Sequence, residues 1–548
     1  MAQTGDTPLP PRRRRWLYVA LVLLLVIGGV GAWASLRVRA DEDRLAAMVG
    51  VIRARGEPLD WAEFAPEPVP PEQNAADLYL QAVTCYERAF RLGSGRGGVE
   101  AEGSGLGELY RLLRDDPASH VRLRAKRAGE VRQVLSLCRD ILPLCRRARA
   151  CGAADWRLSY VGPACYCRPP AWTRLRSVGN VLCLAAVTAA EDSNAPEAVE
   201  SLRDALHLAR GLEAIPHLAF FHTGAQVRQG VCTSIEQLAP TLPVGRGAPD
   251  TRRRVGRLIE ELLAPDRFEW AVLGERSMVY DTAERMRAGQ LSLSMMKAPP
   301  GGVLRGVRDF RLAEAFPALY VSDEIELLAR LNRQVHAGKA QTFPEATRRR
   351  KIRLPGYVPE NSGPLAQLLM PRLASLHEER FRTMALCRLA ATALAIRQYE
   401  LDLGRRPNAL AELVPEYLPA VPADPFAADE RAVGFAPGRA SPVLYSLFKD
   451  GRDDGGAYGT EKGYVLLRIS PDLVLFLNGD RPDGESSPQP YRIVPRALPG
   501  NTAAPKAAPR SVIGTAGGSP PNRTGAGIAF RGAVDDLGPR ENNASPSE

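Results

Sequence analysis

Residues Trp16 to Leu36 form an uncharged and mostly apolar run near the N-terminus. About 20 apolar residues suffice for a helix to cross the hydrocarbon core of a bilayer, which is about 30 Å thick. The run therefore predicts one membrane helix that is followed by a large body. Residues Asp41 to Arg55 are predicted to continue helically, and the prolines between 58 and 71 are predicted to form an extended linker.

The basic residues beside this run predict its orientation. Arg12 to Arg15 precede it, and clustered basic residues favour the cytoplasmic side of a membrane. Arg37, Arg39 and Arg44 on the far side weaken this asymmetry. We expect a single-pass protein of the cell membrane with a cytoplasmic N-terminus and an extracytoplasmic body.

A cleaved signal peptide is the alternative to a retained anchor. Ala32-Trp33-Ala34 satisfies the small-x-small cleavage rule after a basic segment and an apolar segment. Both interpretations move the body out of the cytoplasm.

Length and composition limit the class of the body. At 548 residues the chain exceeds what one hydrophobic core usually supports, so two or more folded units are expected. The 45% hydrophobic and 24% charged fractions are typical of globular proteins, which excludes a multi-span transporter. The net charge of +10 comes from scattered arginines, and aromatic residues make up only 6% of the chain. This pattern predicts a solvated basic surface and not a nucleic-acid interface.

Residues 172 to 263 carry the clearest helical periodicity. Asn194 stands three residues before Glu197 with Pro196 between them, which is a helix-start signal, and Pro216 marks the next start. Short connections between amphipathic helices predict an antiparallel array, although no fixed repeat period is present. A further helix is predicted from Asn74 to Phe90. The apolar stripes repeat every three or four residues: Leu175, Val178, Leu182 and Ala185; Val199, Leu202, Leu206, Ala209 and Leu212; Leu218, Phe221 and Ala225.

Cysteine and histidine do not form a recognisable metal motif. Most of the nine cysteines lie between 138 and 232, and Cys165-Tyr-Cys167 has no histidine partner at zinc-site spacing. Cys183, Cys232 and Cys387 fall in helical runs and are predicted to be buried or occasionally disulfide-bonded. The histidines that stand out are predicted to be surface or packing residues, namely His207, His217 and His222. The glycines from 93 to 98 match a dinucleotide motif formally, but a predicted helix precedes them where a strand is required.

The C-terminal part combines a long helix with short strands. A helix is predicted from about Leu373 to Leu403, ending at Gly404. Strands are predicted at Val443–Phe448, at Tyr464–Leu467 and at Leu473–Leu477. Between the first two strands lies an acidic, glycine-rich turn.

Roughly residues 395 to 467, about an eighth of the chain, resemble the C-terminal region of the major pseudopilins of type II secretion. In that family a helix ends in Tyr-x4-Gly-x2-Pro and is followed by Leu-x-Pro-x-Asp-Pro-aromatic and Tyr-Ser-x3-Asp-Gly. The matching residues are Tyr399, Gly404, Pro407, Pro422, Asp424, Pro425, Phe426, Tyr445, Ser446, Asp450 and Gly451. The resemblance implies a pilin-like helix-and-sheet fold and a calcium ion in the loop after the Tyr-Ser strand. It also extends to uncharacterised, membrane-anchored bacterial proteins.

Two departures argue against a polymerising pilin. The sequence lacks a Gly-Phe-Thr-x2-Glu processing segment, and residues 37–394 separate the membrane run from the region of resemblance. Apart from the resemblance, Asp450, Asp453 and Asp454 lie among glycines and could bind calcium; the alternative is a solvated acidic hairpin. An EF-hand is excluded because Arg452 occupies the third loop position.

The predicted fold class is mainly α, with an antiparallel helical array and a small pilin-like α+β module. The predicted segments are a basic cytoplasmic segment at 1–15, a membrane helix at 16–36, a juxtamembrane helix and linker at 37–71, a helical domain at 72–370, the module at 371–480 and a disordered tail at 481–548.

No G-x-S-x-G, H-E-x-x-H or Walker pattern is present, and we therefore expect a non-enzymatic scaffold or interaction protein of the bacterial cell envelope, with a role in organisation or secretion. Protein partners are expected, and the sequence leaves the oligomeric state open. The alternatives are an extracytoplasmic hydrolase, whose site assembles only in the fold, and a binder of cell-wall polymers.

Overall fold

The structure is a computed structural model of the chain. It describes residues 11–93, 119–164, 172–291, 320–351, 373–458, 460–461, 464–465 and 472–479. The predicted tail at 481–548, most of the glycine-rich loop after residue 93 and the pair Cys165 and Cys167 lie outside these residues.

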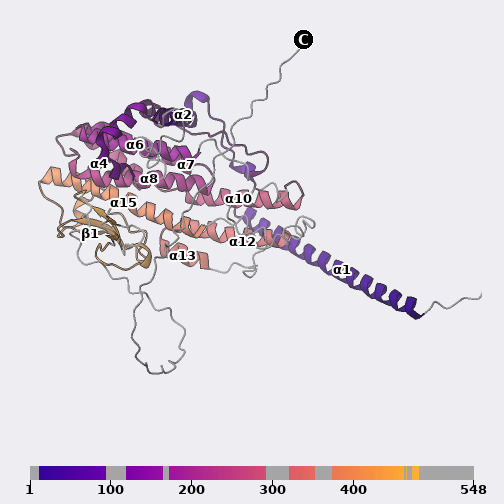
Figure 1. Cartoon of the computed structure of the whole chain (residues 1–548). Helices are drawn as coiled ribbons and strands as arrows, with labels where there is room; N and C mark the ends of the chain where they lie inside the picture. Colours follow the sequence, from indigo (N-terminus) through magenta and orange to yellow (C-terminus); the bar gives the residue numbers. More distant parts are fainter. Residues whose placement is uncertain are drawn as a thin grey trace, which may run out of the picture. The chain divides into compact units, whose positions relative to one another are not determined.

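Helices dominate the described residues, as predicted (Figure 1). The α-helices are α1 (Pro11–Ala54), α2 (Ala75–Gly93), α4 (Ser119–Leu137), α5 (Ile141–Ala150), α6 (Trp172–Glu191), α7 (Ala195–Glu213), α8 (Leu218–Leu238), α9 (Pro249–Leu263), α10 (Phe268–Arg287), α12 (Tyr320–Gly338), α13 (Phe343–Lys351) and α15 (Leu373–Leu403). Short 3-10 turns are η1 (Trp61–Phe64), η2 (Pro71–Gln73), η5 (Ala239–Thr241), η7 (Leu410–Leu413) and η8 (Phe448–Asp450).

Local signals in the sequence place the ends of several helices. The Asn194 side chain accepts a hydrogen bond from the Glu197 amide at 3.3 Å and caps α7. His217 caps α8 by accepting from the Ala219 amide at 3.1 Å. The helix α15 ends where Gly404 adopts a left-handed φ of +68°, which a residue with a Cβ adopts only at a cost. The predicted limits of these helices are confirmed.

The helices α6, α7 and α8 pack side by side and are joined by the short connections 192–194 and 214–217 (Figure 1). The helix α9 then packs on α7, and α15 packs on both α8 and α9. At the other end, Gly274 of α10 lies against the turn before α8, where a Cβ would be only 1.9 Å from the carbonyl oxygen of Pro216. Since α6, α7 and α8 all contact one another, the predicted helical array is present as a group of closely packed neighbouring helices.

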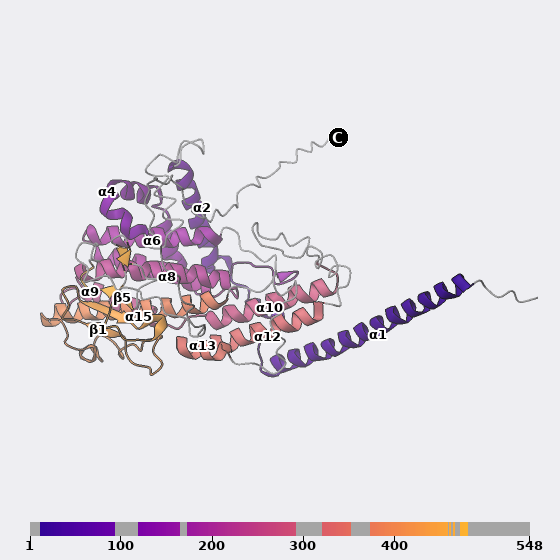
Figure 2. The same cartoon turned by 60° about the horizontal axis from the view of Figure 1, so that its bottom comes forward.

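The C-terminal strands form two small antiparallel sheets. The strands β1 (Gly434–Ala436), β2 (Val443–Ser446) and β5 (Leu473–Phe476) pair in the order β1-β2-β5, and β3 (Thr460–Glu461) pairs with β4 (Tyr464–Val465). The strands β2 and β5 are fully buried and both contact α15, which lies beside them in Figure 2. The antiparallel sheet was predicted, whereas β1 was not, because three residues carry too little periodicity.

One hydrophobic core includes side chains from α2, from α4 to α9, from α13 and α15, and from the strands β2 and β5. Contacts within it cross the predicted boundary at residue 370, since Leu389 and Ile396 of α15 share the core with Leu206 of α7 and with Leu444 of β2. The helical residues and the C-terminal strands thus stabilise one another.

A second, smaller core holds the end of α1 against α12. Leu45, Ile52 and Leu59 pack there with Val321, Ile325 and Leu328. The predicted linker that follows α1 is also packed, because Trp61 and Phe64 of η1 are buried. The ring of Phe64 lies 4.8 Å from that of Trp270 in α10. The residues after the apolar run are therefore attached to the body by specific contacts.

The apolar run itself lies on the first part of α1, and its side chains are exposed. Trp16 is 75% exposed, and Leu36 at the other end is 67% exposed. This is the one helix among the described residues that is long and apolar enough to cross a membrane.

Candidate functional site

A cavity of about 260 Å³ lies where the ends of several helices meet. Two connections contribute to its lining. They are residues 264–267 between α9 and α10 and residues 339–342 between α12 and α13. Its lining carries seven charged side chains, namely Arg228, Lys339, Arg380 and Arg388 and the acidic Glu213, Asp266 and Glu269. Because cations and carboxylates alternate around a partly enclosed space, the cavity suits a small polar or charged molecule.

The most deeply buried pair in the lining is Glu213 of α7 with Arg228 of α8. Their side chains are 2% and 7% exposed, and one guanidinium nitrogen of Arg228 lies 3.4 Å from each carboxylate oxygen of Glu213. Burial raises the pKa of Glu213 to about 7, against the opposing effect of Arg228. Near neutral pH this carboxyl group can therefore accept or release a proton.

Arg380 of α15 is held rigidly on another wall. Its Nε donates to Asp266 at 2.8 Å, and one of its terminal nitrogens donates to the carbonyl oxygens of Gly338 and Ala340 at 2.8 and 3.1 Å. Its guanidinium also lies over the rings of Phe268 and Phe381, at 5.4 and 4.9 Å from their centroids. These contacts fix the positive charge in one orientation.

The described lining is poor in nucleophilic side chains. Among the described residues around the cavity, Thr383 supplies the one hydroxyl group, and it accepts a hydrogen bond from Gln229 at 2.8 Å. A general base is available in Glu213, but no serine or cysteine belongs to the described lining.

The histidines singled out in the sequence make ordinary polar contacts. His207 of α7 lies 2.6 Å from the hydroxyl of Tyr79, and burial lowers the pKa of His207 to about 4. His217 lies 3.3 Å from Glu275. His222 of α8 contacts Glu379 at 2.6 Å through Nδ1, which is the orientation expected for a histidine base. Its Nε2, however, lies 3.1 Å from the amide nitrogen of Gln226, and not beside a serine or cysteine.

The acidic turn is stabilised by local hydrogen bonds. Asp453 accepts from the Tyr445 hydroxyl and from the Gly455 amide, both at 3.0 Å. Asp450 accepts from the Arg452 amide at 3.1 Å. Across the part of the chain that the structure describes, no group of three or more His, Cys, Asp or Glu side chains is placed to hold a metal ion. Calcium binding by Asp450, Asp453 and Asp454 stays a prediction.

Sequence reasoning missed a fourth carboxylate near this turn. Asp472 directly precedes β5 and is fully buried, and it accepts from the Gly456 amide at 2.8 Å. Burial, followed by the nearby charges of Asp454 and Asp453, raises the pKa of Asp472 to about 7. No local pattern in the sequence identifies this residue, because the amides that donate to it, those of Gly456 and Ala457, precede it in the chain by 16 and 15 residues.

Three residues of the pilin-like resemblance, Asp424, Phe426 and Ser446, meet at another carboxylate. Asp424 is 2% exposed and accepts from the Ser446 hydroxyl at 2.6 Å and from the Leu447 amide at 2.7 Å. It also accepts from the Phe426 amide at 2.9 Å. Asp424 thus connects the proline-rich segment after α15 to the end of β2.

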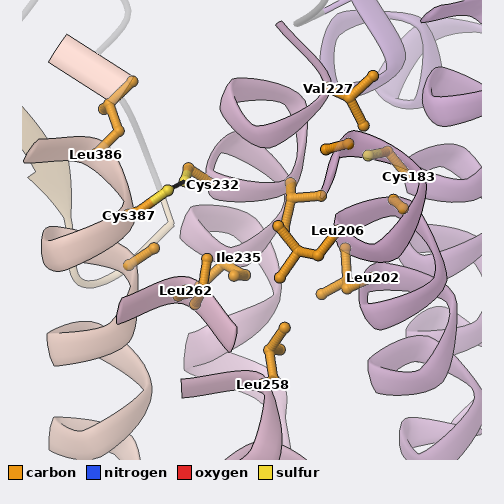
Figure 3. Packing of buried hydrophobic residues seen from close by; sticks show 14 of the residues in the cluster. Cys183, Leu202, Leu206, Val227, Cys232, Ile235, Leu258, Leu262, Leu386 and Cys387 are labelled. Atoms are coloured by element: carbon orange, nitrogen blue, oxygen red, sulfur yellow. Dashed lines mark hydrogen bonds between the residues drawn. The ribbon is translucent and has the colours of Figure 1, made fainter. Parts of the chain in front are cut away.

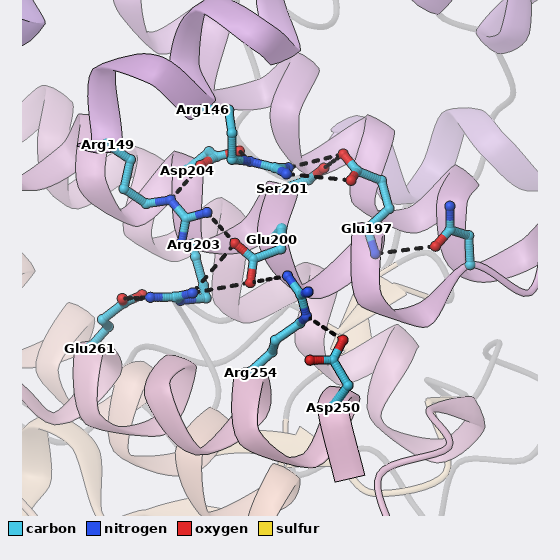
Figure 4. Close-up of polar contacts among 11 residues, drawn as sticks. Arg146, Arg149, Glu197, Glu200, Ser201, Arg203, Asp204, Asp250, Arg254 and Glu261 are labelled. Atoms are coloured by element: carbon cyan, nitrogen blue, oxygen red, sulfur yellow. Dashed lines mark hydrogen bonds and ion pairs between the residues drawn. The ribbon is translucent and has the colours of Figure 1, made fainter. Parts of the chain in front are cut away.

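The prediction of a solvated arginine surface is wrong for several arginines. Figure 4 shows a network between α5, α7 and α9, in which Arg149 pairs with Glu200 and Arg203 donates to Glu261 at 2.7 Å. Arg149 and Arg203 are only 15% and 11% exposed. The neighbouring arginines lower the pKa of Glu200 to about 2 despite its burial. Arg203 also pairs with Glu200 of its own helix at 3.0 Å, whereas Glu261 of α9 and the contact between Arg149 and Glu200 join different helices, which local sequence does not reveal.

Comparisons with known proteins do not assign the cavity or the chain to a known group. No protein-family model, no curated protein and no solved structure matches this sequence.

Proposed function

We propose that this protein is a non-enzymatic scaffold of the bacterial cell envelope, tethered to the membrane by α1, with its body outside the cytoplasm. The observation that carries the proposal is the division of α1 into two parts. Its first part exposes the apolar side chains from Trp16 to Leu36, whereas Leu45 and Ile52 in its last part are buried against α12. Such a helix would hold the body at a fixed position beside the bilayer.

A polar clamp supports the same arrangement. Arg276 of α10 is fully buried and donates to Glu57 at 2.7 Å and to the carbonyl oxygen of Pro58 at 2.8 Å. Lys339 also lies 3.0 Å from Glu57. These contacts join the residues directly after α1 to α10 and to the end of α12. They would keep the body in a fixed position relative to α1.

The C-terminal residues 371–480 are proposed to form a pilin-like module, which points to a role in secretion or envelope organisation. Support comes from the long helix α15, the antiparallel strands packed on it, and the contact of Asp424 with Ser446. The protein partners and the calcium ion that the resemblance implies belong to this proposal.

A second candidate function is the binding of a small polar molecule. The charged cavity around Arg228 and Arg380 favours it, because buried charges on several helices surround an accessible space. A ligand bound there would contact both α8, through Arg228, and α15, through Arg380.

In vivo photo-crosslinking tests the scaffold proposal. A benzophenone amino acid placed at Val161, which is 89% exposed, or at the exposed Arg257 of α9 is expected to give discrete adducts with envelope proteins. The matched control carries the probe at Leu25, which is 67% exposed on the apolar run and should face lipid. A secreted body, made by replacing residues 1–36 with a cleavable signal peptide, should lose the adducts that depend on the tether.

The scaffold proposal would be contradicted if probes placed over the exposed face of the body gave no more protein adducts than the Leu25 control. Adducts that persist unchanged in the secreted body would contradict the need for the tether.

A further inference from the structure

Two thiols from distant parts of the chain face each other inside the core. Cys232 of α8 and Cys387 of α15 are 2% and 1% exposed, and their Sγ atoms lie 3.7 Å apart. Figure 3 shows the two side chains pointing toward each other across the interface of their helices. Because a disulfide bond is about 2.05 Å long, a displacement of less than about 2 Å would join them.

The surroundings distinguish the two sulfur atoms. The hydrogen bond from Cys232 and the nearby Arg228 guanidinium lower the pKa of Cys387, although burial opposes this. Burial raises the pKa of Cys232 instead. Arg228 precedes Cys232 by one helical turn and also lines the charged cavity. In the fold, Arg228 therefore favours the thiolate form of Cys387 over that of Cys232.

We propose that Cys232 and Cys387 form a structural disulfide bond that fastens α8 to α15. The inference rests on the proposed extracytoplasmic position of the body, because disulfide bonds persist in oxidising compartments. The bond would close a loop over residues 233–386. It would connect the helical array covalently to the helix on which the C-terminal strands pack.

The bond forms by exchange with an oxidised dithiol protein of the envelope. One of the two cysteines, as its thiolate, attacks one sulfur of the oxidant's disulfide, which gives a mixed disulfide and releases one oxidant thiolate. The thiol of the other cysteine then loses its proton and attacks the sulfur of the first cysteine, which releases the second oxidant thiolate. Two protein thiols are oxidised to one S–S bond, and the oxidant's disulfide is reduced to two thiols that take up the two protons. Since both sulfurs are buried in the finished fold, the exchange takes place before α15 closes onto α8.

Mass spectrometry of the full chain tests the bond directly. Membranes are solubilised with an alkylating agent in denaturant, without reductant, and the protein is digested. A peptide pair that contains Cys232 and Cys387 is expected, and it should separate after reduction. If both cysteines carry the alkyl group in the unreduced sample, the proposal is overturned, whatever the topology of the chain.

Thermal unfolding supplies a second test. Reductant is expected to lower the melting temperature of the wild-type chain by about 5 °C, because the closed loop is long. The double variant Cys232→Ala/Cys387→Ala should not respond to reductant, whereas the control Cys85→Ala should respond like wild type. An equal response in all three proteins would contradict the bond.

A phosphatase reporter after residue 479 distinguishes a failure of the disulfide proposal from a failure of the proposed extracytoplasmic placement. An active reporter together with free thiols overturns the disulfide alone. An inactive reporter overturns the proposed placement of the body.

Discussion

Replacing Arg276 with alanine is expected to lower the free energy of unfolding by about 3 kcal/mol, because a buried ion pair then loses its cation. Arg276 is fully buried, and one of its nitrogens contacts both Glu57 at 2.7 Å and Asn332 at 2.8 Å. Hydrogen bonds from Arg276 and Lys339 lower the pKa of Glu57, against the effect of burial. In the variant, Lys339 alone would remain to balance the Glu57 charge.

Chemical denaturation of the detergent-solubilised chain measures this effect. The control is Arg285→Ala, since Arg285 pairs with Asp281 one turn away on the same helix and is 30% exposed. Its removal should cost less than about 1 kcal/mol. Arg276→Lys keeps the charge but not the forked geometry of the guanidinium. Its loss of free energy of unfolding should lie between those of the two alanine variants. Protease should also cut the segment between α1 and α2 faster in Arg276→Ala. Equal stability of the two alanine variants would mean that the clamp does not hold α1 to the body.

Leu202→Asp is expected to have a still larger effect and to lower the free energy of unfolding by at least about 5 kcal/mol. Leu202 of α7 is fully buried, and Figure 3 shows it in the core with Leu206 and Leu258. The substitution removes a buried leucine and places a carboxylate in an apolar environment, and both changes are costly. The variant should aggregate or unfold at much lower urea concentration.

The matched control is Leu401→Asp near the end of α15, where the leucine is 41% exposed. This change should lower the free energy of unfolding by less than about 1 kcal/mol. Circular dichroism at increasing urea concentration compares the two variants with wild type. The packing described for α7 would be wrong if Leu202→Asp and Leu401→Asp unfolded at the same urea concentration.

Features that depend on neighbouring residues in the chain could be predicted from the sequence. The start of α7 at Asn194 and the end of α15 at Gly404 follow from local capping signals, and the stripe through Leu202 follows from helical periodicity. The strands β2 and β5 are recognisable because each is a short run of apolar residues. These signals describe single elements and the side chains that each element buries.

The candidate cavity could not be predicted, because its residues meet only in the folded chain. Glu213 and Arg228 are polar residues within helical patterns, and nothing local shows that both are buried. The same holds for Arg276, whose partner Glu57 precedes the helical array, and for Cys232 with Cys387. Sequence periodicity identifies the buried face of a helix, whereas the pairing of buried charges requires the arrangement of all helices.

The most direct test of the proposed tether is a measurement of the side of the membrane on which the body lies. Alkaline phosphatase, which is active only outside the cytoplasm, is fused after residue 479, and a cytoplasmic reporter such as β-galactosidase is fused at the same place in a second strain. The proposed topology predicts an active phosphatase and an inactive β-galactosidase, with the opposite result when residues 16–36 are deleted. A well-expressed full-length fusion with inactive phosphatase and active β-galactosidase would contradict it.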